Sequence, residues 1–101
     1  MTHPNKVKGN SFERELINKA KELGIDAKRA YGSDGRALGE VKEVDAIIGG
    51  VRVQAKRRKQ LPKYLKIDEG VDLVVFREDR GETYALVRWD KILELLKEGL
   101  W

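Results

Sequence analysis

The feature that most constrains the fold is a pair of strand-like segments on either side of two adjacent glycines. The segments before and after Gly49-Gly50 are rich in β-branched and small apolar residues. A two-residue glycine turn between such segments is typical of a tight β-hairpin, and the register it sets places Asp45 opposite Gln54. Because cross-strand partners project to one face and side chains alternate along a strand, Lys56 is predicted to share that face.

This polar face has two interpretations. The opposite face of the predicted hairpin collects only apolar side chains, namely Ala46, Ile48, Val51, Val53 and Ala55. Hairpins with one buried and one solvent-exposed face are common, and they give the same alternation without any function. The pattern alone therefore leaves a functional face and an ordinary wet face as alternatives.

Length and composition exclude several classes of protein. With 101 residues, we expect a single domain over 1–101. There is no cysteine and the one histidine is His3, so disulfide scaffolds, thiol catalysis, histidine triads and multi-histidine metal sites are excluded. No apolar run approaches the ~18 residues of a membrane span, and residues 1–8 lack the apolar core of a signal peptide. We therefore expect a cytoplasmic protein without a membrane partner.

The charge is unevenly distributed along the chain. Residues 1–66 carry 16 Lys or Arg against 8 Asp or Glu, whereas residues 67–101 carry 5 against 9, within a net charge of +4. A basic region of this kind favours a nucleic acid as partner. The alternative is the densely charged, solvated surface of a thermophilic protein, which the scarcity of Asn, Gln, Cys and Met also suggests.

The remaining pattern predicts a mixed α/β domain in which helices pack on a central sheet, with the element order α-β-β-β-α-β-β-α. The expected elements are a helix at 10–23, strands at 25–31, 43–48 and 51–56, a short helix at 61–67, strands at 71–76 and 83–88, and a helix at 91–98. Asn10 and Asp90 are the expected N-caps of the outer helices, and Gly24 and Gly99 their ends. The apolar run at 71–76 is typical of an interior strand.

Two further features mark candidate functional positions. The segment 32–39 contains three glycines and is expected to be a mobile loop, in which Ser33 and Arg36 could bind phosphate or simply form a turn. Glu13 falls on the apolar face of the first helix. It either completes a capping box with Asn10 or has a functional role.

The ordered set Glu13, Ser33, Asp45 and Gln54-Ala55-Lys56 resembles the active-site signature of the PD-(D/E)XK nucleases, in particular the archaeal-type Holliday junction resolvases, which some thermophilic phages also carry. The matching segments are 9–17 for the first helix, 31–33 for the serine loop, 44–48 for the metal-binding strand and 54–56 for the end of the next strand. The resemblance covers residues 9–59. The chain departs from the family in having Val44 in place of proline and Gln54 in place of the usual glutamate.

The resemblance implies a restriction-endonuclease-like core and an endodeoxyribonuclease that uses Mg²⁺, with Mn²⁺ as a substitute. It would act as a homodimer on four-way junctions of double-stranded DNA, with no small-molecule substrate. Asp45 would bind the metal directly, the Gln54 oxygen and the Ala55 carbonyl would complete the site, and Glu13 would act directly or through water. Lys56 would orient the attacking water or stabilise transition-state charge, and Ser33 belongs to the same catalytic set.

Residues that would follow the phosphate backbone lie near this site in the sequence. They are Lys6, Lys8, Arg29, Ser33, Arg36, Lys42, Arg57, Arg58, Lys59 and Lys63. The apolar end Leu100-Trp101 is one candidate for the dimer interface. Two other functions stay open: a flap or single-strand nuclease of the same superfamily, and a non-catalytic nucleic-acid-binding module in which Gln54 marks a lost metal site.

Overall fold

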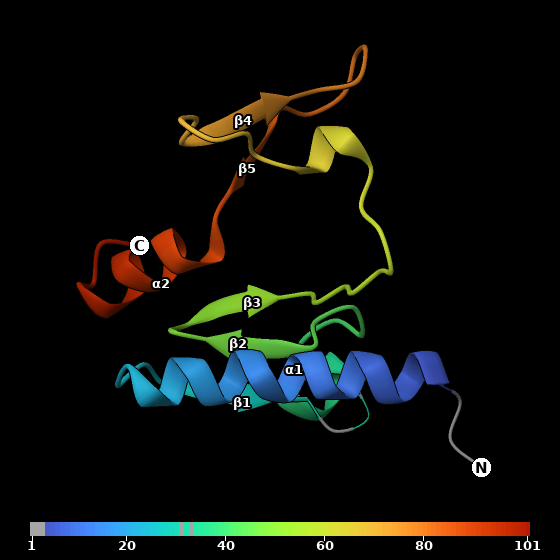
Figure 1. The fold of residues 1–101 in the computed structure, drawn as a ribbon. Coiled ribbons are helices and arrows are strands. Elements are labelled where there is room, and N and C mark those ends of the chain that lie inside the picture. Colours follow the sequence, from blue (N-terminus) through green and yellow to red (C-terminus); the bar gives the residue numbers. More distant parts are fainter. Residues whose placement is uncertain (1–3, 31, 33) are drawn as a thin grey trace. The chain divides into compact units, whose positions relative to one another are not determined.

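The computed structural model describes residues 4–30, 32 and 34–101, with side chains from Asn10 onward. The chain forms two compact units, Met1–Arg57 and Arg58–Trp101. The described residues form a mixed α/β structure with two α-helices and five strands in two antiparallel sheets (Figure 1). The sequence predicts one central mixed sheet, whereas the strands pair as a three-stranded and a two-stranded sheet.

The first unit is one helix on a small sheet. Helix α1 (Pro4–Glu22) lies along the three-stranded sheet, whose strand order is β1-β2-β3 (Figure 1). The strands are β1 (Ala27–Arg29), β2 (Ala46–Ile48) and β3 (Val51–Val53). Ile48 pairs with Val51 across Gly49-Gly50, which confirms the predicted hairpin and its register at the turn.

The two faces of this sheet differ sharply. Ala27 pairs with Ile48, and both are buried on the face that meets α1, where Ile17 and Ala20 of the helix are buried as well. Ile48 is fully buried, a contribution of about 1.5–3 kcal/mol for an aliphatic side chain of this size. We call the face of the sheet that meets α1 the helix-side face, and the opposite face the outer face.

Helix α1 begins earlier than predicted. It starts at Pro4, so Asn10 lies inside the helix and the predicted cap at Asn10 is wrong. Proline suits the first turn of a helix because its missing N–H would have no intrahelical acceptor there. The end of the helix agrees with the prediction, since the chain leaves it at Glu22 and Gly24 has a φ of 77°.

The glycine-rich loop before β2 is partly regular. A 3₁₀ helix, η2, occupies Gly35–Leu38, where the sequence predicts only a mobile loop. The Asp34 side chain accepts a hydrogen bond from the Arg36 N–H and caps this turn. Gly35 is buried against the chain at Val41 and Val44. Tyr31 and Ser33 lie outside the described residues.

The second unit contains a hairpin and a helix. Its elements are the 3₁₀ helix η3 (Lys63–Leu65), strands β4 (Leu73–Phe76) and β5 (Tyr84–Val87), and helix α2 (Trp89–Lys97). The predicted short helix at 61–67 is thus a single 3₁₀ turn after Pro62. The apolar run at β4 predicts an interior strand, whereas β4 pairs with β5 alone in the two-stranded sheet of this unit.

The ends of α2 are only partly as predicted. Arg88, not Asp90, is the N-cap residue, and it makes no side-chain capping bond. Asp90 lies in the first turn, where its charge interacts favourably with the helix dipole. Gly99, with a φ of 71°, follows the last turn as predicted. In the part of the chain that the structure describes, no helix is long and apolar enough to cross a membrane.

Gly35 provides a test of how tightly the loop is packed. A Cβ at Gly35 would collide with the Val41 carbonyl oxygen and lie 2.8 Å from the Val44 Cβ. We expect Gly35→Ala to lower the free energy of unfolding by about 1–3 kcal/mol, measured by urea denaturation, because a backbone neighbour cannot rotate away. Gly39→Asn is the control: Gly39 has a φ of 76° and open space around it, and asparagine tolerates that backbone. Equal stability of Gly35→Ala and the wild type would contradict this packing.

Candidate active site

Glu13 is the buried carboxylate of α1. It is 5% exposed, and its Oε2 accepts a hydrogen bond of 3.0 Å from Arg29 Nε on β1. Arg29 Nη2 also donates to Asn10 Oδ1 at 3.0 Å. The capping-box interpretation of Glu13 and Asn10 is therefore wrong, because both side chains bind the same arginine from the sheet. This arginine offsets the unfavourable burial of the Glu13 charge.

Asp45 lies where the hairpin ladder changes register. Its N–H donates to the Val53 carbonyl at 2.8 Å, while Ala46 also pairs with Val53, so two residues oppose one as in a β-bulge. The predicted pairing of Asp45 with Gln54 is therefore wrong by one residue. As a result the Asp45 carboxylate, 9% exposed, accepts a 2.7 Å hydrogen bond at Oδ2 from the Ala55 N–H.

The electrostatics of Asp45 bring three predicted residues together. Burial raises the pKa of the Asp45 carboxyl above its ordinary value, and the Ala55 hydrogen bond opposes that rise. The negative charge of Glu13 raises the same pKa further, whereas the positive charge of Lys56 lowers it. The charges of Glu13, on α1, and of Lys56, after β3, thus both act on Asp45, which directly precedes β2.

Gln54 and Lys56 continue the β3 strand direction. Exposure alternates from Val51 to Lys56, with both of these side chains exposed. Among the described residues, the Gln54 amide makes no hydrogen bond. Among the described residues, no group of three His, Cys, Asp or Glu side chains is arranged so that it could hold a metal ion. The donors available near Asp45 are therefore two carboxylates, an amide oxygen and main-chain carbonyls.

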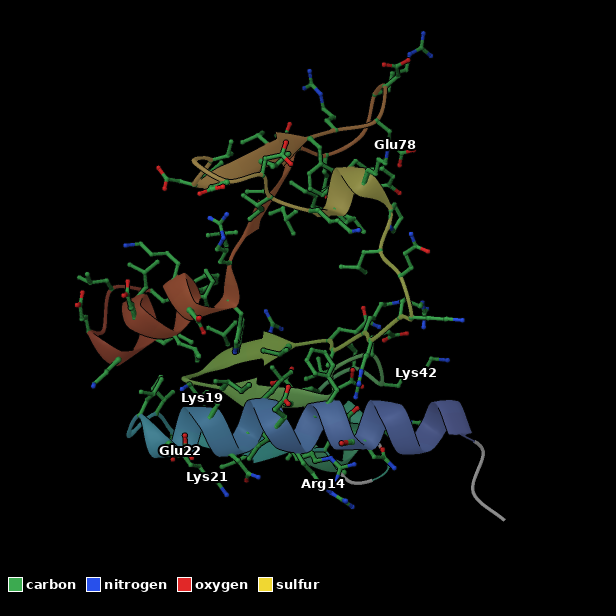
Figure 2. The ribbon with its side chains drawn as sticks, viewed as in Figure 1. Arg14, Lys19, Lys21, Glu22, Lys42 and Glu78 are labelled. Atoms are coloured by element: carbon green, nitrogen blue, oxygen red, sulfur yellow. The ribbon has the colours of Figure 1, made fainter. Side chains whose placement is uncertain are left out.

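The predicted DNA-binding residues are distributed over both units. Lys42 and Arg57 are exposed in the first unit (Lys42 is labelled in Figure 2), and Arg58, Lys59 and Lys63 are exposed in the second. Ser33 and the side chains of Lys6 and Lys8 lie outside the described parts.

Arg36 is held by its neighbour Asp34. Its Nε donates to Asp34 Oδ1 at 3.0 Å, and the Arg36 N–H donates to the same carboxylate. These hydrogen bonds lower the pKa of Asp34 to about 2. The Arg36 side chain is still 72% exposed, so it presents its charge to solvent from a fixed position.

Two roles were not evident from the sequence motifs. Asn10 and Arg29 orient Glu13, although the sequence suggests a cap for the first and a DNA contact for the second. A signal for Arg29 does exist, because Ile25, Ala27 and Arg29 alternate along one strand and the first two are apolar. That alternation predicts Arg29 on the helix-side face, where an acidic partner is required.

Comparison with known proteins gives consistent matches. The family model described as archaeal Holliday junction resolvase (hjc) matches residues 4–98. The chain is 34% identical over 88 residues to the protein named crossover junction endodeoxyribonuclease Hjc of Archaeoglobus fulgidus. That alignment covers 82% of this chain and 62% of the relative, so the chain spans less than two thirds of the relative's length. No solved structure matches the chain significantly.

The Glu13–Arg29 pair should carry measurable stability. We expect Arg29→Ala to lower the free energy of unfolding by roughly 2–4 kcal/mol, because it removes the arginine charge and hydrogen bond from a buried carboxylate. Adding Glu13→Gln should restore part of the loss, since the uncompensated charge is then gone. Arg14→Ala, an exposed arginine next to Glu13 in sequence, should change stability by less than about 0.5 kcal/mol. Urea denaturation in EDTA measures these four proteins and Glu13→Gln alone, and strictly additive effects of Arg29→Ala and Glu13→Gln would refute the coupling.

Asp45 should make the protein less stable as the pH rises. Its native pKa lies above the ~3.9 of an unfolded aspartate, so the native state binds the proton more tightly and wild-type stability falls as the pH rises through the window between the two values. Asp45→Asn has no such ionisation. We expect its melting temperature in EDTA to exceed that of the wild type at pH 7, and the difference to vanish below about pH 4. The exposed Asp26→Asn is the control; an Asp45→Asn variant that is less stable at every pH would contradict the electrostatic origin.

Proposed function

Because this chain belongs to the archaeal Holliday junction resolvase family, we propose that it is a structure-selective endodeoxyribonuclease that resolves four-way DNA junctions by paired phosphodiester hydrolysis. The observation that carries the proposal is the grouping of Glu13, Asp45 and Lys56. The charges of Glu13 and Lys56 both act on Asp45, which itself accepts the 2.7 Å hydrogen bond from the Ala55 N–H. Phosphodiester hydrolysis requires this combination of metal ligands and a charge-stabilising group.

The residues present fit Mg²⁺, with Mn²⁺ as a substitute. Magnesium prefers oxygen donors and needs only one or two carboxylates. Burial and the charge of Glu13 both disfavour the ionised form of Asp45, and a bound dication would reverse that effect. In extended chain the N–H and C=O of one residue point to the same side, so the Ala55 carbonyl is expected beside Asp45. We therefore assign Asp45, Glu13, the Gln54 oxygen and the Ala55 carbonyl as the ligands.

The chain's own residues have distinct roles in this proposal. A bound magnesium ion supplies positive charge and a water of lowered pKa. We assign to Lys56, which is exposed and whose charge acts on Asp45, the stabilisation of the charge that develops on the phosphate. Arg29 is a positioning residue that holds Glu13 at a fixed point of the site. Ser33 is assigned to the catalytic set on the family resemblance alone.

The substrate and the assembly are also proposals. The exposed cations Lys42, Arg57, Arg58, Lys59 and Lys63, with Arg36, are available to contact DNA phosphates, and Lys6 and Lys8 join them on the basis of sequence. Paired cuts in opposing strands require two active sites, so we propose a homodimer. Leu100 and Trp101, 67% and 69% exposed, are candidates for its interface. The family match over residues 4–98 supports a single restriction-endonuclease-like domain.

One observation favours a second candidate function. The family's usual glutamate is replaced by Gln54, which removes a charged ligand from the proposed metal site. A protein with a weakened metal site could bind junctions without cutting them. The alternative is therefore a non-catalytic junction-binding module that uses the same basic residues.

Cleavage assays distinguish the two functions. Labelled four-way junction, duplex and single-stranded DNA are incubated with the protein in Mg²⁺ or in EDTA. We expect paired nicks in the junction only, and only with Mg²⁺. Asp45→Asn should bind the junction normally and cut at least about 100-fold more slowly, as expected when a group that stabilises transition-state charge is lost. Gln54→Ala should also lose most of the activity.

The exposed Asp79→Asn, the same chemical change on a turn of the second unit, should cut at the wild-type rate. Binding of the junction by the wild type without any cutting would favour the non-catalytic module. Equal cleavage by the wild type and Gln54→Ala would exclude Gln54 from the site. Preferred cutting of single strands or flaps would instead assign the protein to another branch of the nuclease superfamily.

A further inference from the structure

The outer face of the three-stranded sheet carries a row of cations beside the candidate active site. Lys28 of β1 pairs with Ile47 of β2, and Ile47 pairs with Arg52 of β3, so the three side chains project from the same face. Lys28 and Arg52 are exposed, and Ile47 between them is half-buried. Because neighbouring strands are about 4.8 Å apart, the two cations leave the sheet about 10 Å from each other.

This row is in line with the proposed catalytic lysine. Arg52 is the central residue of β3, and exposure continues to alternate after the strand ends at Val53, so that Arg52, Gln54 and Lys56 are all exposed. At about 3.3 Å per residue of extended chain, the backbone positions of Arg52 and Lys56 are at most about 13 Å apart. That length corresponds to about four base pairs of B-form DNA at ~3.4 Å each. A duplex arm that presents a phosphate to Lys56 is therefore long enough to reach Arg52, and Lys28 beside it, within a few base pairs.

Both cations are available to an anion. In the described residues no acidic side chain lies within 4.0 Å of the Lys28 ammonium, although Asp26 lines the same small hollow together with Ile47. Arg52 has a single, long contact, 3.7 Å from Arg52 Nη1 to Glu40 Oε2. The arginine side chain is 69% exposed in that pair, so the contact is weak and can be exchanged. An arginine guanidinium binds a phosphate through two parallel hydrogen bonds, which a long contact with Glu40 does not provide.

We propose that Lys28 and Arg52 form a phosphate-binding subsite that holds the DNA arm next to the scissile phosphate, and that Glu40 occupies Arg52 until DNA replaces it. The ligand is the phosphodiester backbone of duplex DNA, read by charge without base contacts. This subsite rests on the proposed function, since it takes its place relative to Lys56. It is not among the basic residues that the sequence singles out, because only the strand register places Lys28 and Arg52 in one row.

The test is the salt dependence of DNA binding. Fluorescence anisotropy with a labelled junction in EDTA is measured from 50 to 200 mM salt for the wild type, Lys28→Ala and Arg52→Ala. Each variant should reduce the log–log slope by about 0.9, which means a roughly 3.5-fold smaller change in affinity over that range. Lys21→Ala removes the same charge from the exposed surface of α1 (Figure 2) and should leave the slope unchanged. A plain duplex should show the same differences, because the subsite holds an arm and not the branch point.

Glu40 supplies a second, independent measurement. Glu40→Gln should tighten junction binding by between about 1.4-fold and fivefold, the range expected when an exposed competing ion pair is removed. In the Arg52→Ala background the same change should have no effect. Suppose that the wild type binds and cuts the junction. If the salt-dependence slopes of Lys28→Ala and Arg52→Ala then equal the slope of Lys21→Ala, the proposed subsite is wrong. Absence of junction binding by the wild type would instead overturn the proposed function.

Discussion

The contact on which the first unit depends is the bond between Arg29 and Glu13. A carboxylate that is 5% exposed would be strongly unfavourable in a helix–sheet interface without a counter-charge. Arg29 supplies that charge at 3.0 Å and binds Asn10 one turn earlier, so β1 is fastened to α1 at two points. The same contact fixes where Glu13 can act. An interaction required for packing thus also positions one of the proposed metal ligands.

Asp45 differs from the Arg29–Glu13 pair, because its ionised form is unfavourable in the folded chain while its position suits the proposed metal site. The change of ladder register at this residue turns its carboxylate toward the Ala55 N–H and places it near Glu13 and Lys56. Burial and like charge both oppose its ionisation, so the site is unfavourable for the folded chain without a cation. Bulges in antiparallel ladders commonly re-aim a side chain in this way, and carboxylates with a shifted pKa are enriched at functional sites. The arrangement is what a metal-dependent hydrolase would require of this sheet.

The two faces of the three-stranded sheet have different roles: one packs against α1 and the other exposes charged side chains. The helix-side face buries Ala27, Ala46 and Ile48 against α1 and contributes the apolar stabilisation. The outer face keeps Lys28 and Arg52 in solvent, in one row across the strands. Period-two alternation produces both faces from the same short strands. A sheet of only three residues per strand can therefore pack a helix and still present charge to a polyanion.

The sequence by itself determined the local features of this protein. The hairpin at Gly49-Gly50 and its register at the turn, the end of α1 near Gly24 and the end of α2 near Gly99 depend on turn chemistry and periodicity, which act between residues close in the chain. The residues Glu13, Asp45, Gln54 and Lys56 could be named as candidates from the motif. Helix starts were less predictable: α1 begins at Pro4 and α2 at Trp89, whereas the sequence favoured Asn10 and Asp90 as the N-caps.

Only the tertiary structure decided which partners these residues have. Arg29 binds Glu13 and Asn10 across a separation of 16 and 19 residues, and no local rule pairs them. The bulge at Asp45 depends on Ala30, directly after β1, and on Val53 of β3. Likewise, Lys28 and Arg52 come into one row only because β1 and β3 both pair with β2. In each case the deciding contact joins segments far apart in the chain, so it exists only once the sheet and the helix have come together.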